Sequence, residues 1–194
     1  MIPTHNVYLL RLLLLTVVLP ALAQDKVEVE RAASTSEVPT AAREWFEEAY
    51  ATPTRAQWYF EQTSGETSYE AKLKHAGQWH SVEFGEDGTL QDIEIIVQDR
   101  ELPKEVRQPI RTYLDTTYTR HRIKKIQRQL TGSPDALRGA VRDEQVSGVT
   151  ERYEIEFYGK NDQEKALWEG LFDDTGQLLE RRRIVLRPTD NLTY

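Results

Sequence analysis

The chain has 194 residues, and its 25 lysines and arginines against 32 aspartates and glutamates give a formal net charge of −7. A protein this acidic is poorly suited to bind nucleic acid or an anionic lipid surface, because both need clustered lysine and arginine. The chain has no cysteine, which excludes disulfide bonds and a lipidated amino-terminal cysteine.

The first 23 residues predict a cleavable secretory signal peptide. Arg11 precedes an apolar run over Leu12–Leu19, and Ala21-Leu22-Ala23 has the small-residue pattern of a cleavage site. The run is too short to span a bilayer as a helix. A buried hydrophobic segment is the alternative, but no later element has a matching pattern.

We therefore expect cleavage after Ala23 and a periplasmic or secreted mature chain. Removing 23 of 194 residues leaves 171, enough for one domain with a single core. Arg11 is the only lysine, arginine, aspartate or glutamate removed, so the mature net charge is −8. No second apolar segment is long enough to insert into a membrane.

Residues 24–37 are charged and rich in small residues, and they predict a flexible leader. The first helix is expected to begin at Val38-Pro39, because apolar residues then recur at helical spacing as far as Tyr50. An aromatic stretch over Gln57–Glu61 predicts a short strand.

The stretch from Tyr69 to Val97 predicts a three-stranded antiparallel meander, with two-residue turns at Ala76-Gly77 and Asp87-Gly88. Turns of this length fix the register, and alternation then separates an apolar core face from a polar face. We call the second one the open face. The register places Tyr69 opposite Phe84, Ala71 opposite Val82 and Leu73 opposite His80, with Ile93 and Ile95 beside them on the core face.

The second half of the chain repeats this order. Leu102-Pro103 precedes a predicted helix over Glu105–Tyr118, followed by a strand over Arg122–Leu130 and a looser meander from Tyr153. The repetition predicts an internal duplication, with units 38–100 and 101–188 and a tail 189–194. Residues 131–148, rich in Gly, Ser, Pro and Asp, are expected to be an inserted loop in the second unit.

Several of these residues carry a resemblance to a known family. Val38-Pro39, Leu102-Pro103, Trp58, Tyr69-Glu70-Ala71 and the two glycine turns resemble the PepSY-like, putative β-lactamase-inhibitor-like periplasmic proteins. The resemblance covers nearly all of Val38 to Leu186. It implies an α+β fold in which a helix packs on an antiparallel meander sheet and the unit occurs twice. The shared residues belong to turns and core, so the resemblance implies fold rather than activity.

No pattern in the sequence predicts catalysis or a cofactor. Asp174-Thr175-Gly176 has the spelling of an aspartic-protease triplet, but that chemistry needs two carboxylates, and a single hairpin turn explains this one copy. His75 and His80 flank one turn and His121 is remote in sequence, so a zinc site with three converging ligands is not expected. We therefore predict no catalytic residue, no metal and no enzymatic activity.

The open face carries the candidate binding residues. The register puts Glu70, Glu83 and Asp92 side by side across three strands, where like charges oppose one another. The ordinary explanation is a solvated face, and the alternative is a patch for a basic partner or a cation. Trp79 and Ile96 lie opposite each other on the same face.

An exposed aromatic residue beside polar groups is typical of an interface anchor. The sequence therefore predicts an exported, non-enzymatic module that contacts a protein or peptide of the cell envelope through the open face and the hairpin tips. Inhibition of an exported hydrolase is one version. The alternative is a structural or homodimeric envelope protein in which a dimer, the leader or the inserted loop covers Trp79 and Ile96.

Overall fold

A computed structural model describes residues 25–26, 28–50, 55–63 and 65–185. The predicted signal peptide over residues 1–23, its cleavage site and the tail 189–194 lie outside the described residues. Within the described part of the chain, no helix is both long enough and apolar enough to cross a membrane.

The described residues form one ten-stranded sheet, three α-helices and one short 3-10 helix. In chain order the elements are β1 Asp25–Lys26, β2 Glu28–Ala32, α1 Thr40–Ala49, β3 Gln57–Thr63, β4 Glu66–His75, β5 Gln78–Gly85, β6 Leu90–Ile96, η1 Asp99–Glu101, α2 Lys104–Thr117, β7 Arg120–Gly132, α3 Pro134–Val141, β8 Val149–Lys160, β9 Lys165–Phe172 and β10 Leu178–Ile184.

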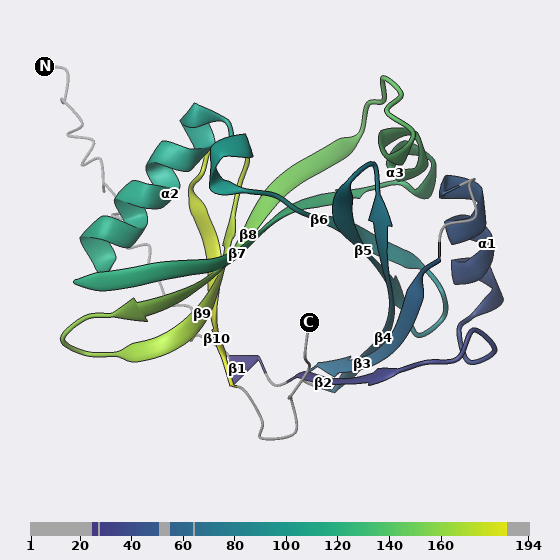
Figure 1. Cartoon of the computed structure of the whole chain (residues 1–194), viewed down its shortest axis with the longest axis horizontal. Helices are drawn as coiled ribbons and strands as arrows, with labels where there is room; N and C mark the ends of the chain where they lie inside the picture. The colour runs from purple at the N-terminus through teal and green to yellow at the C-terminus, as the bar shows by residue number, and fades with distance from the viewer. Residues whose placement is uncertain (1–24, 27, 51–54, 64, 186–194) are drawn as a thin grey trace, which may run out of the picture.

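Strands β2 to β10 pair in chain order, each antiparallel to the next, and β1 pairs parallel with β10. Figure 1 shows that the sheet curls strongly, so that its two edges approach each other, and that α1, α2 and α3 lie on its outer side. We call the outer side the convex face and the inner side the concave face. The predicted α+β class, with helices on one face of an antiparallel sheet, is confirmed.

The register predicted for the meander is confirmed between β4 and β5, and between β5 and β6 as far as Glu83 and Asp92. Beyond that pair a β-bulge places Phe84 opposite Leu90, so the predicted two-residue turn at Asp87-Gly88 is wrong, and residues 86–89 join β5 to β6. Tyr69 pairs with Phe84 and Leu73 with His80 on β4 and β5, and His80 pairs with Ile95 on β6. These residues lie on the convex face, which holds the core. The alternate positions, predicted as the open face, therefore lie on the concave face.

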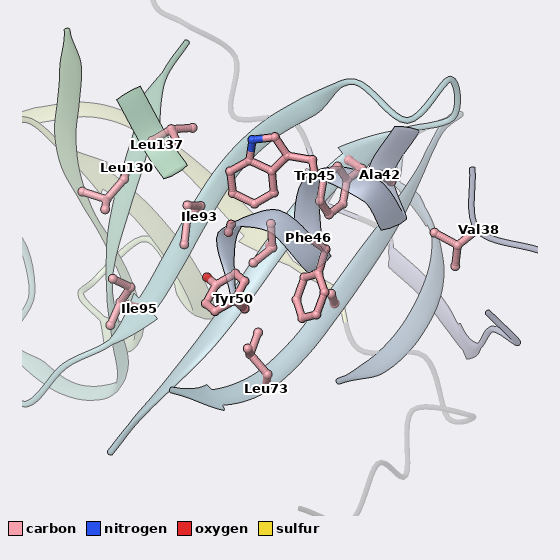
Figure 2. Packing of buried hydrophobic residues seen from close by; sticks show 14 residues of the cluster. Val38, Ala42, Trp45, Phe46, Tyr50, Leu73, Ile93, Ile95, Leu130 and Leu137 are labelled. Carbon is pink, nitrogen blue, oxygen red and sulfur yellow. The ribbon is translucent and has the colours of Figure 1, made fainter. Parts of the chain in front are cut away.

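The core has two clusters, one under each long helix. In the first, Trp45, Phe46 and Tyr50 of α1 and its C-cap pack onto β4, β5 and β6, as Figure 2 shows. In the second, Val106, Ile110 and Leu114 of α2 pack onto β8 and β9. Each fully buried aliphatic or aromatic side chain contributes about 2 kcal/mol. The two halves share this arrangement, and their origin in a duplication stays a prediction.

The expectation that residues 24–37 form a flexible leader is corrected for two short segments. Asp25–Lys26 pairs with β10, and Glu28–Ala32 pairs with β3 over five positions. This part of the chain therefore hydrogen-bonds to both edges of the sheet. Edge strands carry unpaired backbone groups, and a polar segment can satisfy them without any apolar periodicity. The search for apolar periodicity missed β2 for that reason.

The expectation of an inserted loop over 131–148 is corrected as well. Strand β7 continues to Gly132, and α3 follows at once. The Ser133 side chain accepts a hydrogen bond from the Ala136 amide, and Pro134 occupies the first turn, which is a standard helix start. Leu137 is fully buried in the first core cluster, so α3 is part of the core.

Candidate binding surface on the concave face

The structure brings the predicted acidic residues together. Glu70 pairs with Glu83 and Glu83 with Asp92 across β4, β5 and β6, as the register predicted. Their exposure differs from the prediction, because Glu70 and Asp92 are each only 8% exposed. Curvature of the sheet crowds side chains on its concave side and removes water from them. These two acids therefore offer little surface to a partner.

The charge of Glu70 is balanced inside the protein by Lys72. The Lys72 Nζ atom lies 2.8 Å from Glu70 Oε2, 3.1 Å from each carboxylate oxygen of Glu30 and 4.0 Å from Glu61 Oε1. Burial raises the pKa of Glu70, but the Glu61 carboxyl and the Lys72 ammonium outweigh burial and hold that pKa below its usual value. Burial lowers the pKa of Lys72, but Glu70 and Glu30 outweigh it and raise that pKa.

This arrangement also bears on metal binding. Oxygen atoms of Glu30, Glu61 and Glu70 lie within 4.8 Å of one another, a spacing that a cation could bridge. The Lys72 ammonium already contacts all three carboxylates. It links β2, β3 and β4 through their side chains, so the cluster works as a structural ion-pair network.

A substitution tests this role of Lys72. We expect Lys72→Met to lower the free energy of unfolding by about 3 kcal/mol, because it leaves buried carboxylates without their counter-charge. Urea unfolding at neutral pH measures the loss. Lys74→Met is the matched control, since Lys74 is the next exposed lysine on β4, and a change of about 0.5 kcal/mol or less is expected. Equal losses of unfolding free energy in the two variants would contradict the role of Lys72 as the counter-charge of the buried carboxylates.

Asp92 is as buried as Glu70, but no cation among the described residues forms an ion pair with it. Its Oδ2 atom accepts a hydrogen bond from Gln129 Nε2 at 3.0 Å, whereas Oδ1 has no hydrogen-bond partner among the described residues. Burial raises the pKa of Asp92 to about 8, and the charges of Glu83, Glu154 and Glu70 add to the rise. Asp92 is therefore largely protonated at neutral pH.

The stability of the protein should depend on pH through Asp92. Its pKa is near its usual value of about 4 in the unfolded chain and about 8 in the folded protein. The folded state therefore holds the proton more tightly, and the stability from Asp92 is complete below pH 4 and lost as the pH rises through 8.

Asp92→Asn imitates the protonated form. We expect it to match the parent near pH 4 and to exceed it by about 2 kcal/mol near pH 8, measured by urea unfolding at both pH values. Asp162→Asn, at an exposed turn between β8 and β9, is the control and should follow the parent at both. A pH-independent effect of Asp92→Asn would show that the pKa of Asp92 is not raised in the folded protein.

The Asp174-Thr175-Gly176 triplet and the three histidines considered in the sequence analysis have ordinary structural environments. Asp173 Oδ1 accepts hydrogen bonds from the amides of Thr175 and Gln177 at 2.9 Å each, so the Asp174-Thr175-Gly176 triplet is the hairpin turn between β9 and β10, as predicted. The rings of His75 and His80 lie 5.3 Å apart, and Tyr50 Oη lies 3.1 Å from His80 Nδ1. His121 instead pairs with Asp115.

Trp79 and Ile96 remain accessible on the concave side. His80 pairs with Ile95, so the next position along both strands brings Trp79 and Ile96 beside each other at the end of the β5–β6 pair. Trp79 is 55% exposed and Ile96 is 43% exposed. They form the exposed apolar part of the predicted site.

Two surface cavities flank this pair. A cavity of about 900 Å³ is lined by Trp79, Lys74 and Arg55, among others, between α1 and the ends of β3 and β4. A second, of about 520 Å³, is lined by Ile96, Lys124 and neighbours where β6 and β7 separate. We call the set Trp79, Ile96, Lys74, Arg55 and Lys124 the rim patch.

Sequence reasoning missed the cations of the rim patch. Lys74 could have been found, because the predicted register already put it opposite Trp79, as the structure confirms. Arg55 could not, since only the tertiary packing of α1 against the sheet brings it to the same cavity.

Sequence comparisons place the chain in no family: no family model matches it, and neither does any curated protein sequence. Solved structures with a similar fold include a DUF2874 family protein from Bacteroides ovatus, at 15% identity and a TM-score of 0.51, covering 78% of this chain and 89% of that one. A putative periplasmic protein from Bacteroides eggerthii has 15% identity and a TM-score of 0.49, covering 75% and 88%. A BLIP-like protein from Bacteroides fragilis has 13% identity and a TM-score of 0.46, covering 81% and 92%.

At these identities the likeness to the Bacteroides ovatus protein concerns the fold alone.

Proposed function

We propose that the protein is an exported, non-enzymatic binding module of the cell envelope that contacts a protein or peptide through the rim patch. Export rests on the signal-peptide pattern of residues 1–23. In one version of this proposal the partner is an exported hydrolase, which the protein inhibits by binding it.

The observation that carries the proposal is the exposure of Trp79 and Ile96 side by side, between two cavities. A tryptophan buries a large area on binding and loses few rotamers, which is why aromatic residues dominate the binding energy of interfaces. Glu70 and Asp92, two of the three acids predicted to contact the partner, are each only 8% exposed. We therefore assign the proposed contact to the rim of the concave face rather than to its centre.

A site-specific crosslink tests the proposal. We expect a photoreactive residue in place of Ile96 to give a discrete adduct in the envelope of the native cell. Trp79→Ala in the same chain should remove the adduct, because it takes away the neighbouring anchor, while the free energy of unfolding changes by about 0.5 kcal/mol or less.

Leu179, which is 52% exposed on β10, is the matched control position, and a photoreactive residue there should give no such adduct. An adduct that survives Trp79→Ala would contradict the rim patch as the site. An adduct of twice the mass of the chain, with dimers in sedimentation, would support the homodimeric alternative.

A further inference from the structure

The rim patch is basic, although the chain as a whole is acidic. Four cationic side chains line the larger cavity, against one carboxylate, that of Glu47. The cations are Arg43, Arg55, Lys72 and Lys74. This local excess is opposite in sign to the net charge of −7.

Two of these cations already have partners. Lys72 is neutralised by Glu30 and Glu70. Arg43 donates hydrogen bonds to the Val38 carbonyl at 3.2 Å and to Thr40 Oγ1 at 3.0 Å. Arg55 and Lys74 are exposed, and no carboxylate of the described residues pairs with either. They are the two cations of this cavity that are available to a ligand.

The same cavity also has an apolar side. Trp79, Trp58 and Phe46 line it together with the two available cations. The neighbouring cavity repeats the combination in a smaller form, with Ile96 beside Lys124, whose ammonium lies 5.7 Å from the centre of the Tyr158 ring. A ligand that fits must therefore supply negative charge and apolar surface together.

We propose that the segment recognised by the rim patch is an acidic, apolar peptide segment of the partner, with a carboxylate between Arg55 and Lys74 and an adjacent apolar side chain on Trp79. This inference rests on the proposed function and gives its partner a chemistry. The charge of this partner is opposite to that of the basic partner suggested from the sequence by Glu70, Glu83 and Asp92.

Local charge decides this recognition. Charges on exposed groups are screened beyond about 8 Å at physiological ionic strength, so the net negative charge of the chain acts weakly on a segment seated in the cavity. Charge-assisted hydrogen bonds from arginine and lysine to a carboxylate act at contact distance. An acidic segment is thus accepted at the rim by a protein that is acidic elsewhere.

Three labelled peptides test the inference by fluorescence anisotropy with the mature chain. One alternates glutamate with leucine, one alternates glutamate with serine, and one alternates lysine with leucine. We expect the glutamate–leucine peptide to bind best. The double variant Arg55→Glu, Lys74→Glu should weaken its binding about tenfold or more and should bind the lysine–leucine peptide better than the parent does.

The matched control is Lys104→Glu, Lys165→Glu, which makes the same change of net charge at exposed positions on α2 and β9. It should leave the glutamate–leucine affinity within about twofold of the parent. Both double variants change exposed side chains, and thermal unfolding verifies that each one folds.

Three results would overturn the inference: binding to none of the peptides, preference of the parent for the lysine–leucine peptide, or equal weakening by both double variants. Equally strong binding to phosphatidylglycerol vesicles would assign the cations to a lipid surface and overturn it too. If the Ile96 crosslink still depends on Trp79 in any of these cases, the proposed function stands without the acidic partner. Absence of the Ile96 adduct from the chain that retains Trp79 would overturn the proposed function itself.

Discussion

The ion-pair network around Lys72 joins the three strands at the amino-terminal edge of the curled sheet. A strongly curled sheet crowds the side chains of its concave face, and here carboxylate oxygens of Glu30, Glu61 and Glu70 on that face lie within 4.8 Å of one another. Carboxylates removed from water repel each other strongly unless a cation is among them. Lys72 supplies that cation and joins the amino-terminal strand β2 to β3 and β4. The edge strand is thereby held by side chains as well as by its backbone ladder.

The two faces of the curled sheet differ in polarity and in what covers them. The convex face is apolar and is covered by α1, α2 and α3, as Figure 1 shows. The concave face is polar, yet Glu70, Asp92 and Gln127 on it are almost as buried as core residues. Surface suited to recognition is left at the rim, where Trp79 and Ile96 stand between two cavities lined by cations. Stability and recognition thus use different parts of one face.

The sequence predicted local pairing well and curvature poorly. The two-residue turn at Ala76-Gly77 and the alternation of apolar residues set the register of β4 and β5, and of β6 as far as Asp92, because a slip by one residue would turn every side chain to the other face. The bulge at Phe84 was missed, since a bulge leaves this alternation unchanged in the rest of the strand. Burial of Glu70 and Asp92 could not be predicted, since it depends on how all the strands curl together. Strand β2 was missed because backbone pairing at an edge leaves no apolar pattern. Helix α3 was missed although Ser133-Pro134 is a helix start, because the three glycines of residues 131–148 and the same proline favoured a loop.

The central claim is that the rim of the concave face, and not its acidic centre, contacts the partner. Backbone and indole N–H chemical shifts of the mature chain, followed by NMR during titration with the glutamate–leucine peptide, test it most directly. The account predicts the largest shifts at the Trp79 indole and at the amides of Lys74 and Ile96, with Glu61 and Asp92 unchanged. Shifts centred on Glu61 and Asp92, with the Trp79 indole unmoved, would contradict it.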